Sequence, residues 1–574
     1  MAVCPRPREI DCDVLVIGAG VAGLFAAIEA SKLVDRVVLV DKAKIGRSGC
    51  SPFAAGIYDA CFPSDNLDEW VRELVVAGEY LNDQEWVRQH CQNTYEVVRR
   101  LDEWAENEGK QIFRQDEAGN FWRGKSRGHI HTSHLVFDAL AAIDTLRRKA
   151  REEKVNFVER TVITDLVTDS QGRLRGALGF NYRQGIFYLF LARAVVAAAG
   201  GCGYKSIFLG HKNLTGDIQA AAFRAGATLK NMEFTSSNTC HRDYDTHGMN
   251  LFVHVGGRFI NSLGEDFMWK YRPDLGPKGR RQDLCLAFCR EVKEGRGPIY
   301  LDLSAANEEG KKLCRQILPE TFKAWERAGV DPFDQPMEWV PAFYGTLSTS
   351  GGIDIDLNCA TSLEGLFAAG DASCSPANGA GGPGGAAYPY ASVSGFLAGG
   401  AAGRYAREKA DQRVRGERLN QVEENLERFV RPVKISSGLT SGQLVSEMQK
   451  VLFPFPVSFL KNRESLEHAL SQIEMIKERC PDIQAKDGHE LVKAWEANNM
   501  IELAELFLKT SLMRTESRGF HFREDFPRTD NVNWLKWICW RKKGKDLETW
   551  TRDIPTPYVK PENDYETPPG IIRT

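Results

Sequence analysis

A short apolar strand that runs directly into a glycine turn is the feature that most constrains this fold. Residues 13–17 are apolar and rich in β-branched side chains, and a Gly-x-Gly-x-x-Gly run occupies Gly18 to Gly23. A helical pattern follows to residue 31, and a second apolar run, 36–40, ends at Asp41. A strand, a glycine turn, a helix, a strand and an acid in this order are typical of a dinucleotide-binding βαβ unit.

Each residue of this motif has a predicted task. Gly18 allows the tight turn, Gly20 lets the backbone approach a pyrophosphate, and Gly23 lets the helix pack closely on the strand. The positive end of the helix dipole then faces the phosphates. Asp41 stands where its carboxylate can accept a hydrogen bond from a ribose hydroxyl. Together these positions predict a bound dinucleotide.

The nucleotide-binding pattern returns far along the chain. Residues 363–371 form a short run that ends in Gly-Asp, a glycine-dense loop follows from Gly379 to Gly385, and a helix of small residues begins at about Ser392. More than 300 residues separate the two halves. A nicotinamide-binding domain usually closes within one continuous stretch, so this division favours FAD over NAD. We expect the first half to hold the ADP portion, and the second half to hold the ribitol and the flavin ring.

Periodicity predicts the remaining elements. We expect helices over 65–110, 135–152, 404–430, 440–478 and 488–516. We expect short strands over 156–160, 164–168, 174–181, 186–191 and 194–198. The tail, 541–574, has little periodicity and is predicted to be an extended arm. Near it lie four tryptophans that either pack on this chain or meet a partner, namely Trp534, Trp537, Trp540 and Trp550.

Composition excludes several classes of protein. Lys plus Arg is 74 and Asp plus Glu is 77, and the net charge of −3 gives no support to a nucleic-acid or polybasic membrane role. The 14 cysteines are scattered without a CxxC pair or a ferredoxin-type run, so we expect no iron–sulfur cluster in this chain. Neither a membrane span nor a signal peptide is visible. We therefore expect a cytoplasmic protein, with any membrane attachment made through a partner.

Segments along nearly the whole chain resemble one flavoprotein family. The chain is similar to the flavoprotein subunit of succinate dehydrogenase and fumarate reductase, in the broad sense that includes L-aspartate oxidase and adenylylsulfate reductase alpha. The matching segments, in family order, are 13–23, 44–57, 197–203, 215–227, 232–234, 294–297, 351–353, 365–371, 514–519 and 523–527.

The resemblance implies a fold class and a domain order. It implies an α/β FAD-binding domain of the Rossmann-like, two-dinucleotide-binding type, with an inserted α+β capping domain and a C-terminal helical domain. The FAD-binding domain would comprise 1–230 and 351–403, and the capping, substrate-binding domain 231–350. The helical domain would comprise 404–540, followed by the arm, 541–574.

The resemblance also implies non-covalent FAD and a set of residues that hold it. Cys50 stands at the position assigned to the histidine that links the flavin covalently in the succinate and fumarate enzymes. The expected cofactor residues are Gly18, Gly20, Gly23, Asp41, Lys42, Arg47, Ser48, Gly49, Ala55, Gly56, Val162, Ala199, Gly200, Asp217, Gly370, Asp371 and Ala386.

The substrate groups of the family are mostly replaced. The carboxylate-binding histidines fall at Asn238 and Leu347, the late-loop arginine falls at Gly382, and a Thr-Glu pair falls at Met249 and Asn250. A dicarboxylate needs a cationic or donor-rich group at each end, so we expect a small substrate other than succinate or fumarate. The central arginine, a proton donor in fumarate reduction, is retained as Arg296. The candidates for its proton chain are Glu265, His241, His247 and His254.

We therefore expect an FAD-dependent two-electron oxidoreductase, the flavoprotein subunit of a hetero-oligomer with a small ferredoxin-like iron–sulfur subunit. Two alternatives stay open. Segment 512–518 and the helix before it resemble adenylylsulfate reductase alpha more closely, and loss of the dicarboxylate groups also suits an electron-relay flavoprotein without a substrate. The motif His129, His131 and His134 is open between a flavin-pocket role, a zinc site and an ordinary polar loop, and we expect no metal.

Overall fold

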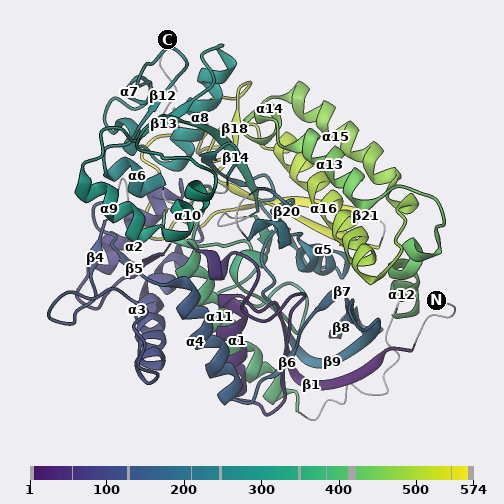
Figure 1. Cartoon of the computed structure of the whole chain (residues 1–574). Coiled ribbons are helices and arrows are strands. Elements are labelled where there is room, and N and C mark those ends of the chain that lie inside the picture. Colours follow the sequence, from purple (N-terminus) through teal and green to yellow (C-terminus); the bar gives the residue numbers. More distant parts are fainter. Residues whose placement is uncertain are drawn as a thin grey trace.

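The structure of the protein is a computed structural model. It describes residues 6–54, 56–125, 129–207, 210–244, 249–346, 351–382, 384–410, 422–544 and 546–566. Figure 1 shows a lower part built on a large sheet and the helices beside it, an upper part with several short helices and strands, and a set of long C-terminal helices.

A large mixed sheet forms the core of the predicted FAD-binding domain. Its order is β6-β2-β1-β9-β8-β7, and β16 pairs with β9 beyond the end of β8. Strands β6, β2, β1, β9 and β16 are parallel, whereas β7, β8 and β9 are antiparallel. The bounds are β1 Arg8–Ile17, β2 Val37–Val40, β6 Asn156–Val158, β7 Thr161–Thr168, β8 Leu174–Asn181, β9 Ile186–Ala197 and β16 Leu366–Ala368.

One long strand replaces two predicted ones. The runs 186–191 and 194–198 are joined in β9, which continues through the charged Arg193. Arg193 is tolerated because its guanidinium forms an ion pair with Asp13 on β1 and donates to the carbonyl of Ala410 at 2.9 Å. The length of β9 lets the first half of the nucleotide pattern and the late strand β16 share one sheet.

Two helices from the two halves of the nucleotide pattern pack directly on each other. These are α1 (Val21–Ser31) and α11 (Ala387–Glu408). A Cβ built on Gly395 would lie 2.2 Å from the carbonyl oxygen of Ala22, and one on Gly399 2.3 Å from that of Ala26. The small residues of the late helix are therefore required by this close helix contact.

The segment between β2 and β6 forms helices and a small sheet. Helices α2 (Leu67–Ala77) and α3 (Gln84–Glu106) replace the single predicted helical region, and β3 (Ile57–Asp59), β5 (His134–Val136) and β4 (Arg123–Gly124) make a three-stranded sheet. The helix predicted from residue 135 begins later, as α4 (Ala139–Glu152). The reason is local, because Asp138 caps it by accepting the amide of Ala141 at 2.9 Å.

The capping domain has its own sheet and its own core. The sheet order is β11-β14-β13-β12, and the core contains Phe252, Phe288, Trp325 and Trp339. The strands are β11 Ser236–His241, β12 Arg258–Ile260, β13 Tyr300–Asp302 and β14 Met337–Gly345. The helices are α6 Met249–His254, α7 Met268–Tyr271, α8 Arg281–Lys293, α9 Glu308–Ile317 and α10 Pro319–Arg327.

The C-terminal region is helical and then returns to a sheet. Its helices are α12 Val422–Val430, α13 Ser441–Leu452, α14 Phe455–Ser458, α15 Arg463–Glu478 and α16 Gly488–Met513, and short strands are β17 Leu460–Lys461, β18 Phe522–Arg523, β19 Thr529–Asp530 and β22 Tyr565–Glu566. The first part of the predicted arm is instead a hairpin, β20 (Lys536–Lys543) with β21 (Asp546–Asp553). Strand β20 also pairs with β10 (Leu229–Lys230), which pairs with β15 (Gly352–Ile353). Within the described ranges no helix has the length and apolar character needed to cross a bilayer.

Candidate functional site

The glycine turn between β1 and α1 leaves no room for side chains. Gly18 has a φ of +100°, and a Cβ there would lie 2.4 Å from the Cα of Ala199. A Cβ on Gly23 would lie 1.8 Å from the carbonyl oxygen of Gly18. At the start of α1, the amide of Val21 donates to Ser51 Oγ at 3.1 Å. The positive end of α1 is thus brought close to the sheet edge, as anion binding requires.

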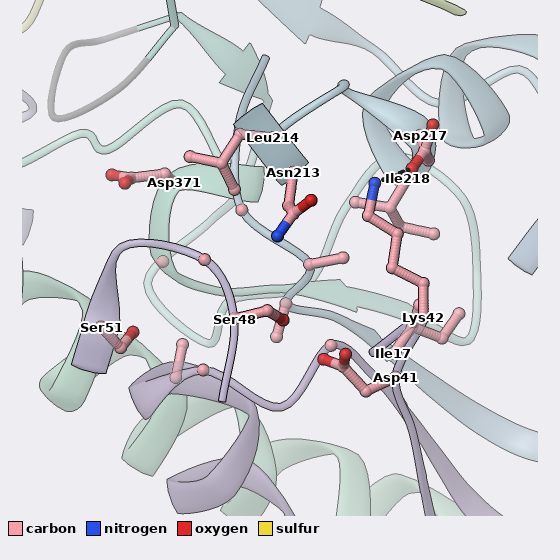
Figure 2. A pocket seen from close by; sticks show the side chains of 18 of the residues that line it. Ile17, Asp41, Lys42, Ser48, Ser51, Asn213, Leu214, Asp217, Ile218 and Asp371 are labelled. Carbon is pink, nitrogen blue, oxygen red and sulfur yellow. Dashed lines mark hydrogen bonds and ion pairs between the residues drawn. The ribbon is translucent and has the colours of Figure 1, made fainter. Parts of the chain in front are cut away.

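A cavity lies at the carboxyl ends of the parallel strands, the usual ligand position of such sheets. It is walled by the residues that directly follow β1, β2, β9 and β16 (Figure 2). In Figure 2, Lys42 and Asp217 lie on one side of the view, and Ser51 and Asp371 on the other. Of the expected cofactor residues, it is lined by Gly18, Gly20, Asp41, Lys42, Ser48, Gly49, Val162, Ala199, Gly200, Asp217, Gly370 and Asp371.

Asp41 is held rigidly at the end of β2. Its two carboxylate oxygens accept the backbone amides of Ala19 at 2.8 Å and Ala43 at 2.7 Å. Burial raises the pKa of Asp41, although these two amides favour the carboxylate. Glycine walls, a helix N-terminus and a fixed acid in one cavity fit the ADP portion of a dinucleotide.

Lys42 is the centre of a charged cluster that reaches into the C-terminal domain. Its ammonium donates to Thr215 Oγ1 at 2.7 Å, to Asp217 at 2.8 Å and to Glu496 at 3.0 Å. Burial opposes the charge, but the two carboxylates outweigh it and raise the pKa of Lys42. Asn499, also on α16, donates to Asp217 at 2.9 Å. Sequence reasoning missed Glu496 and Asn499, because Glu496 lies 454 positions after Lys42 and Asn499 lies 282 positions after Asp217.

The other expected cofactor residues lie outside the cavity lining. Gly23 is packed beneath the turn, Arg47 pairs with Asp144 on α4 at 2.7 Å, and the carbonyl of Gly56 accepts the amide of Phe137 at 2.9 Å. Ala386 precedes α11 and is buried, and Ala55 lies outside the described residues. Their roles with the flavin stay predictions.

Several lining residues carry no sequence signal. Ser51 begins the short 3-10 helix Ser51–Phe53, Asn213 and Leu214 stand at the end of another, His211–Asn213, and periodicity singles out none of these positions. The amide-capping contact of Ser51 with α1 is visible only in three dimensions. Cys50 also lines the cavity. A substitution of Cys50 can therefore test the prediction that the flavin is non-covalent.

Arg296 forms an ion pair within the capping domain. Its Nε donates to Glu291 Oε2 and its Nη2 to Glu291 Oε1, both at 2.6 Å. Glu291 is fully buried and also accepts from Asn261 at 2.9 Å and Tyr271 at 2.7 Å. Burial opposes this charge, but the hydrogen bonds lower the pKa of Glu291 to about 2. The guanidinium is therefore committed to an internal ion pair, and Arg296 is not among the residues that line the cavity.

The other expected catalytic residues are also placed within the capping domain. Glu265 is exposed and accepts the side chain of Asn261 at 2.7 Å. His241 is buried beside Tyr244 and two tryptophans, and burial lowers its pKa. His254 is exposed at the end of α6, and His247 lies outside the described residues. None of the three described side chains lines the cavity, and their catalytic roles stay predictions.

Arg281, which sequence reasoning missed, connects three parts of the chain. It is the first residue of α8, and it donates to the carbonyl of Gly382 at 3.0 Å and to Ser236 Oγ at 3.4 Å. Its guanidinium lies 5.3 Å from the ring centre of Phe520. It therefore faces the glycine-dense loop, at the position where the resemblance places the lost arginine. No sequence pattern distinguishes it from the neighbouring Arg280.

Buried polar groups without partners occur in the segment before this loop, at the start of α8 and in or next to β11. A Cβ built on Gly381 would lie 3.4 Å from Gln282 Nε2, and Asn378 lies in the segment that leads into the loop. Asn238, in the expected substrate position, is on β11 beside Ser236 and Ser237. In the described part of the chain, no hydrogen-bond partner exists for Gln282 Nε2, Asn378 Nδ2, Ser375 Oγ, Thr235 Oγ1 or Asn238 Oδ1. Such orphaned groups are typical of a site that takes a polar ligand.

The histidine motif is divided among different partners. His129 Nδ1 lies 2.7 Å from Glu73 Oε1, and His131 Nε2 lies 3.0 Å from Glu69 Oε2. His134 begins β5, and burial lowers its pKa to about 4. Within the described ranges, no group of three or more histidine, cysteine or acidic side chains could hold a metal ion. The geometry thus offers no support to the zinc alternative.

Two family models match this chain. The FAD binding domain model matches residues 13–387, which is more than half of the chain, and the model described as fumarate reductase flavoprotein C-term matches residues 446–565. The first match spans the first half of the nucleotide pattern, the capping insertion, and the second half up to the start of α11. The second begins in α13 and ends in β22.

Individual proteins match over nearly their whole lengths. A protein named as one subunit of fumarate reductase (CoM/CoB), from Methanothermobacter marburgensis, is 29% identical over 93% of this chain and 97% of its own. The quinol fumarate reductase FrdA of E. coli has a TM-score of 0.87 at 23% identity, covering 98% of this chain and 100% of its own. Adenylylsulfate reductase from Archaeoglobus fulgidus has a TM-score of 0.78 at 20% identity, with 96% of each chain covered.

The two structural similarities establish the fold, and the family models add the cofactor. The family models confirm the prediction that the chain binds FAD. Together with the structural similarity to FrdA, they confirm the predicted fold of an FAD-binding domain with a capping insertion and a C-terminal helical domain. The chain belongs to the FAD-binding family of the fumarate reductase and succinate dehydrogenase flavoproteins, and it is an FAD-dependent oxidoreductase.

Proposed function

We propose that this flavoprotein oxidises or reduces a small anionic substrate other than succinate or fumarate, held between β11, the start of α8 and the loop 379–385. The observation that carries the proposal is Arg281. It is a cation that donates to the carbonyl of Gly382 in this loop and to the hydroxyl of Ser236, and the next residue, Gln282, has a buried amide nitrogen without a partner in the described residues. One fixed guanidinium with neutral donors suits a substrate with one anionic end.

Different residues bind the cofactor, bind the substrate and exclude water in the proposed reaction. FAD, when bound, supplies the two-electron chemistry. Asp41 and the glycine turn bind and orient its ADP portion, with Lys42 and α16 closing that end. Arg281 anchors the anionic end of the substrate, and the orphaned amides of Gln282 and Asn378 orient the rest. The capping strand β11 excludes water from this side.

Arg296 is the alternative anchor for the anionic end of the substrate. Matched variants of Arg281 and Arg296 distinguish between these two arginines. We expect Arg281→Gln to lower the response to substrate by about 10- to 100-fold, because a charge-assisted hydrogen bond contributes about 1.5–3 kcal/mol. We expect Arg296→Gln to retain the response. The measurement is stopped-flow reoxidation of dithionite-reduced protein by a panel of fumarate, monocarboxylic enoates and adenylylsulfate. Full activity of the Arg281 variant, or rapid turnover of fumarate, would contradict the proposal.

We infer that the FAD is non-covalent, because Cys50 stands where the family resemblance implies the linking histidine. We expect no bond between the Cys50 thiol and the flavin. Acid precipitation should release yellow FAD into the supernatant. Yellow colour that stays with the pellet in the wild type and is lost in Cys50→Ala would instead identify a cysteinyl link.

We propose an iron–sulfur protein as the electron partner. The chain's cysteines form no cluster-binding run, and the Methanothermobacter relative is named as one subunit of an enzyme. The similarity to adenylylsulfate reductase lies in the fold, so adenylylsulfate remains one member of the substrate panel. The relay without a substrate is disfavoured by the orphaned polar groups around Arg281.

A cytoplasmic location and the domain boundaries 1–230, 231–350, 351–403 and 404–540 also belong to the proposal. The separate core of the capping sheet supports those boundaries.

A further inference from the structure

Glu79 lies where three parts of the chain meet. It follows α2, and together with Tyr80 it has a left-handed backbone, with φ values of +52° and +61°. Residues other than glycine rarely adopt this conformation, and it persists where the surroundings hold it. Here the carbonyl of Glu79 accepts the guanidinium of Arg518 at 2.8 Å, and the Arg518 side chain is fully buried. The turn after α2 therefore has a fixed partner in the C-terminal region.

The carboxylate of Glu79 holds two residues at once. Its Oε2 accepts the backbone amide of Gly519 at 2.7 Å, and its Oε1 lies 3.3 Å from Nη1 of Arg280. The Glu79 side chain is 14% exposed, so water screens these contacts less than it would at an open surface. Arg280 directly precedes α8 of the capping sheet region, and Gly519 belongs to the C-terminal region. One carboxylate thus joins both regions to the end of α2.

Each residue that Glu79 holds precedes one member of a contacting pair. Arg280 is followed by Arg281 and Gly519 by Phe520, and the Arg281 guanidinium lies 5.3 Å from the centre of the Phe520 ring. Such a cation–π contact is weak on its own, so the direction of the guanidinium depends on how the two backbones are held. Glu79 therefore supports both sides of this pair from one point.

The glycine-dense loop is docked against the same segment. The amide of Ala380 donates to the carbonyl of Gly78 at 2.9 Å, and the carbonyl of Ala380 accepts the amide of Phe520 at 3.3 Å. Arg281 in turn donates to the carbonyl of Gly382, in the same loop, at 3.0 Å. The proposed substrate anchor, its aromatic partner and the loop therefore all depend on one short segment after α2.

We propose that Glu79 is a positioning residue that directs the Arg281 guanidinium toward the anionic end of the substrate. This inference rests on the proposed function, in which Arg281 binds that end. Glu79 itself does not touch the substrate. It keeps Arg280 and Gly519 in place, so that Arg281 is already ordered before the substrate binds, and affinity is gained because less freedom is lost on binding.

The first measurement needs no substrate. FAD-loaded protein is treated with phenylglyoxal, which modifies arginine side chains, and the modification rate of Arg281 is followed by peptide mass spectrometry. We expect Glu79→Gln and Arg280→Gln each to raise this rate by about 3- to 10-fold, because each removes the same charge-assisted contact. Glu79→Gln keeps an oxygen for the Gly519 amide, which favours a folded variant. If it nevertheless yields no folded protein, Arg280→Gln decides alone.

Two controls separate positioning from a general loss of structure. Arg296 in the same samples should react at an unchanged rate, since its ion pair with Glu291 lies at the other end of α8. Asp68→Asn is the matched variant, because it removes a carboxylate of α2 that pairs with Arg88 at 2.7 Å, and it should leave Arg281 unchanged. An unchanged Arg281 rate in either folded test variant, or a parallel rise for Arg281 and Arg296, would overturn the proposal.

The second measurement uses a panel compound, such as a monocarboxylic enoate, that reoxidises the reduced flavin. We expect Glu79→Gln to raise the concentration for the half-maximal rate by about 3- to 10-fold, while the limiting rate changes less. In an Arg281→Gln background the same substitution should have no further effect, because the residue that it positions is gone. Equal effects in both backgrounds would contradict the role of Glu79. If no panel compound reoxidises the flavin, the proposed function fails, and the phenylglyoxal rates still decide whether Glu79 positions Arg281.

Discussion

The two ends of the candidate site differ in how their polar groups are satisfied. At the ADP end, Asp41 and Lys42 already have protein partners at 2.7–3.0 Å. Around the loop 379–385, Gln282 and Asn378 have buried polar atoms without partners in the described part of the chain. The first end is a preformed cradle. The second end keeps polar atoms that a ligand could satisfy, and there we propose that this chain departs from the dicarboxylate enzymes.

The largest effect should come from filling the cradle. Gly23→Ala would place a Cβ 1.8 Å from a backbone oxygen, so we expect loss of FAD binding and a large fall in the free energy of unfolding. Gly442→Ala is the control, because nothing lies within 4 Å of a Cβ at that helical position. Flavin content after purification and thermal melting measure both. A fully loaded Gly23→Ala protein would refute the assignment of the turn.

Removing the lysine of the cradle should rank second. Lys42→Met leaves Asp217 and Glu496 close together without their shared cation, so we expect a loss of about 3 kcal/mol in unfolding free energy and weaker FAD binding. Urea unfolding and FAD titration measure these changes. Lys205→Met removes a partner of Glu496 but not of Asp217, and it should have the smaller effect. Equal effects would show that the cluster is not centred on Lys42.

The third prediction separates the two arginines by pH. Glu291 has its pKa lowered to about 2 from an ordinary value of 4.5, so its contribution to stability is present above pH 4.5 and is lost as the pH falls toward 2. Arg296→Gln should therefore cost about 2 kcal/mol at neutral pH and much less near pH 3. Arg281→Gln should leave the acid unfolding curve unchanged. Urea midpoints measured from pH 3 to pH 7, a range set by that pKa shift, provide the check.

The smallest effect is expected at the C-terminal hairpin. Removing 541–574 would cut through β20, so a point substitution is the sharper test. Trp550 is 37% exposed, whereas Trp537 and Trp540 are buried on this chain. Trp550→Ser should weaken association with an iron-containing partner by about 1–2 kcal/mol and leave FAD binding intact. Co-purification from native cells with iron analysis tests it, and unchanged iron recovery would remove the hairpin from the interface.

The sequence predicted the cradle better than the substrate region, for a physical reason. A glycine turn, a strand and an acid act through local backbone geometry, so the positions of Gly18, Gly23 and Asp41 can be inferred from spacing. Arg281 and Glu79 acquire their positions from contacts with Gly382 and Gly519, 101 and 440 residues away in sequence. The family resemblance favoured Arg296, whereas its ion pair with Glu291 is apparent only in the folded capping domain.

The ion pair between Lys42 and Glu496 has a consequence for folding during translation. These residues are 454 positions apart, and Asn499 on the same helix contacts Asp217. During synthesis the glycine turn and β1 leave the ribosome early, yet the α16 partners of the lining residues Lys42 and Asp217 are still untranslated. The nucleotide end is complete only after α16 has emerged and docked. Stable cofactor retention is consequently a property of the nearly finished chain, and a ribosome stalled before α16 would carry a folded-looking domain with an incomplete site.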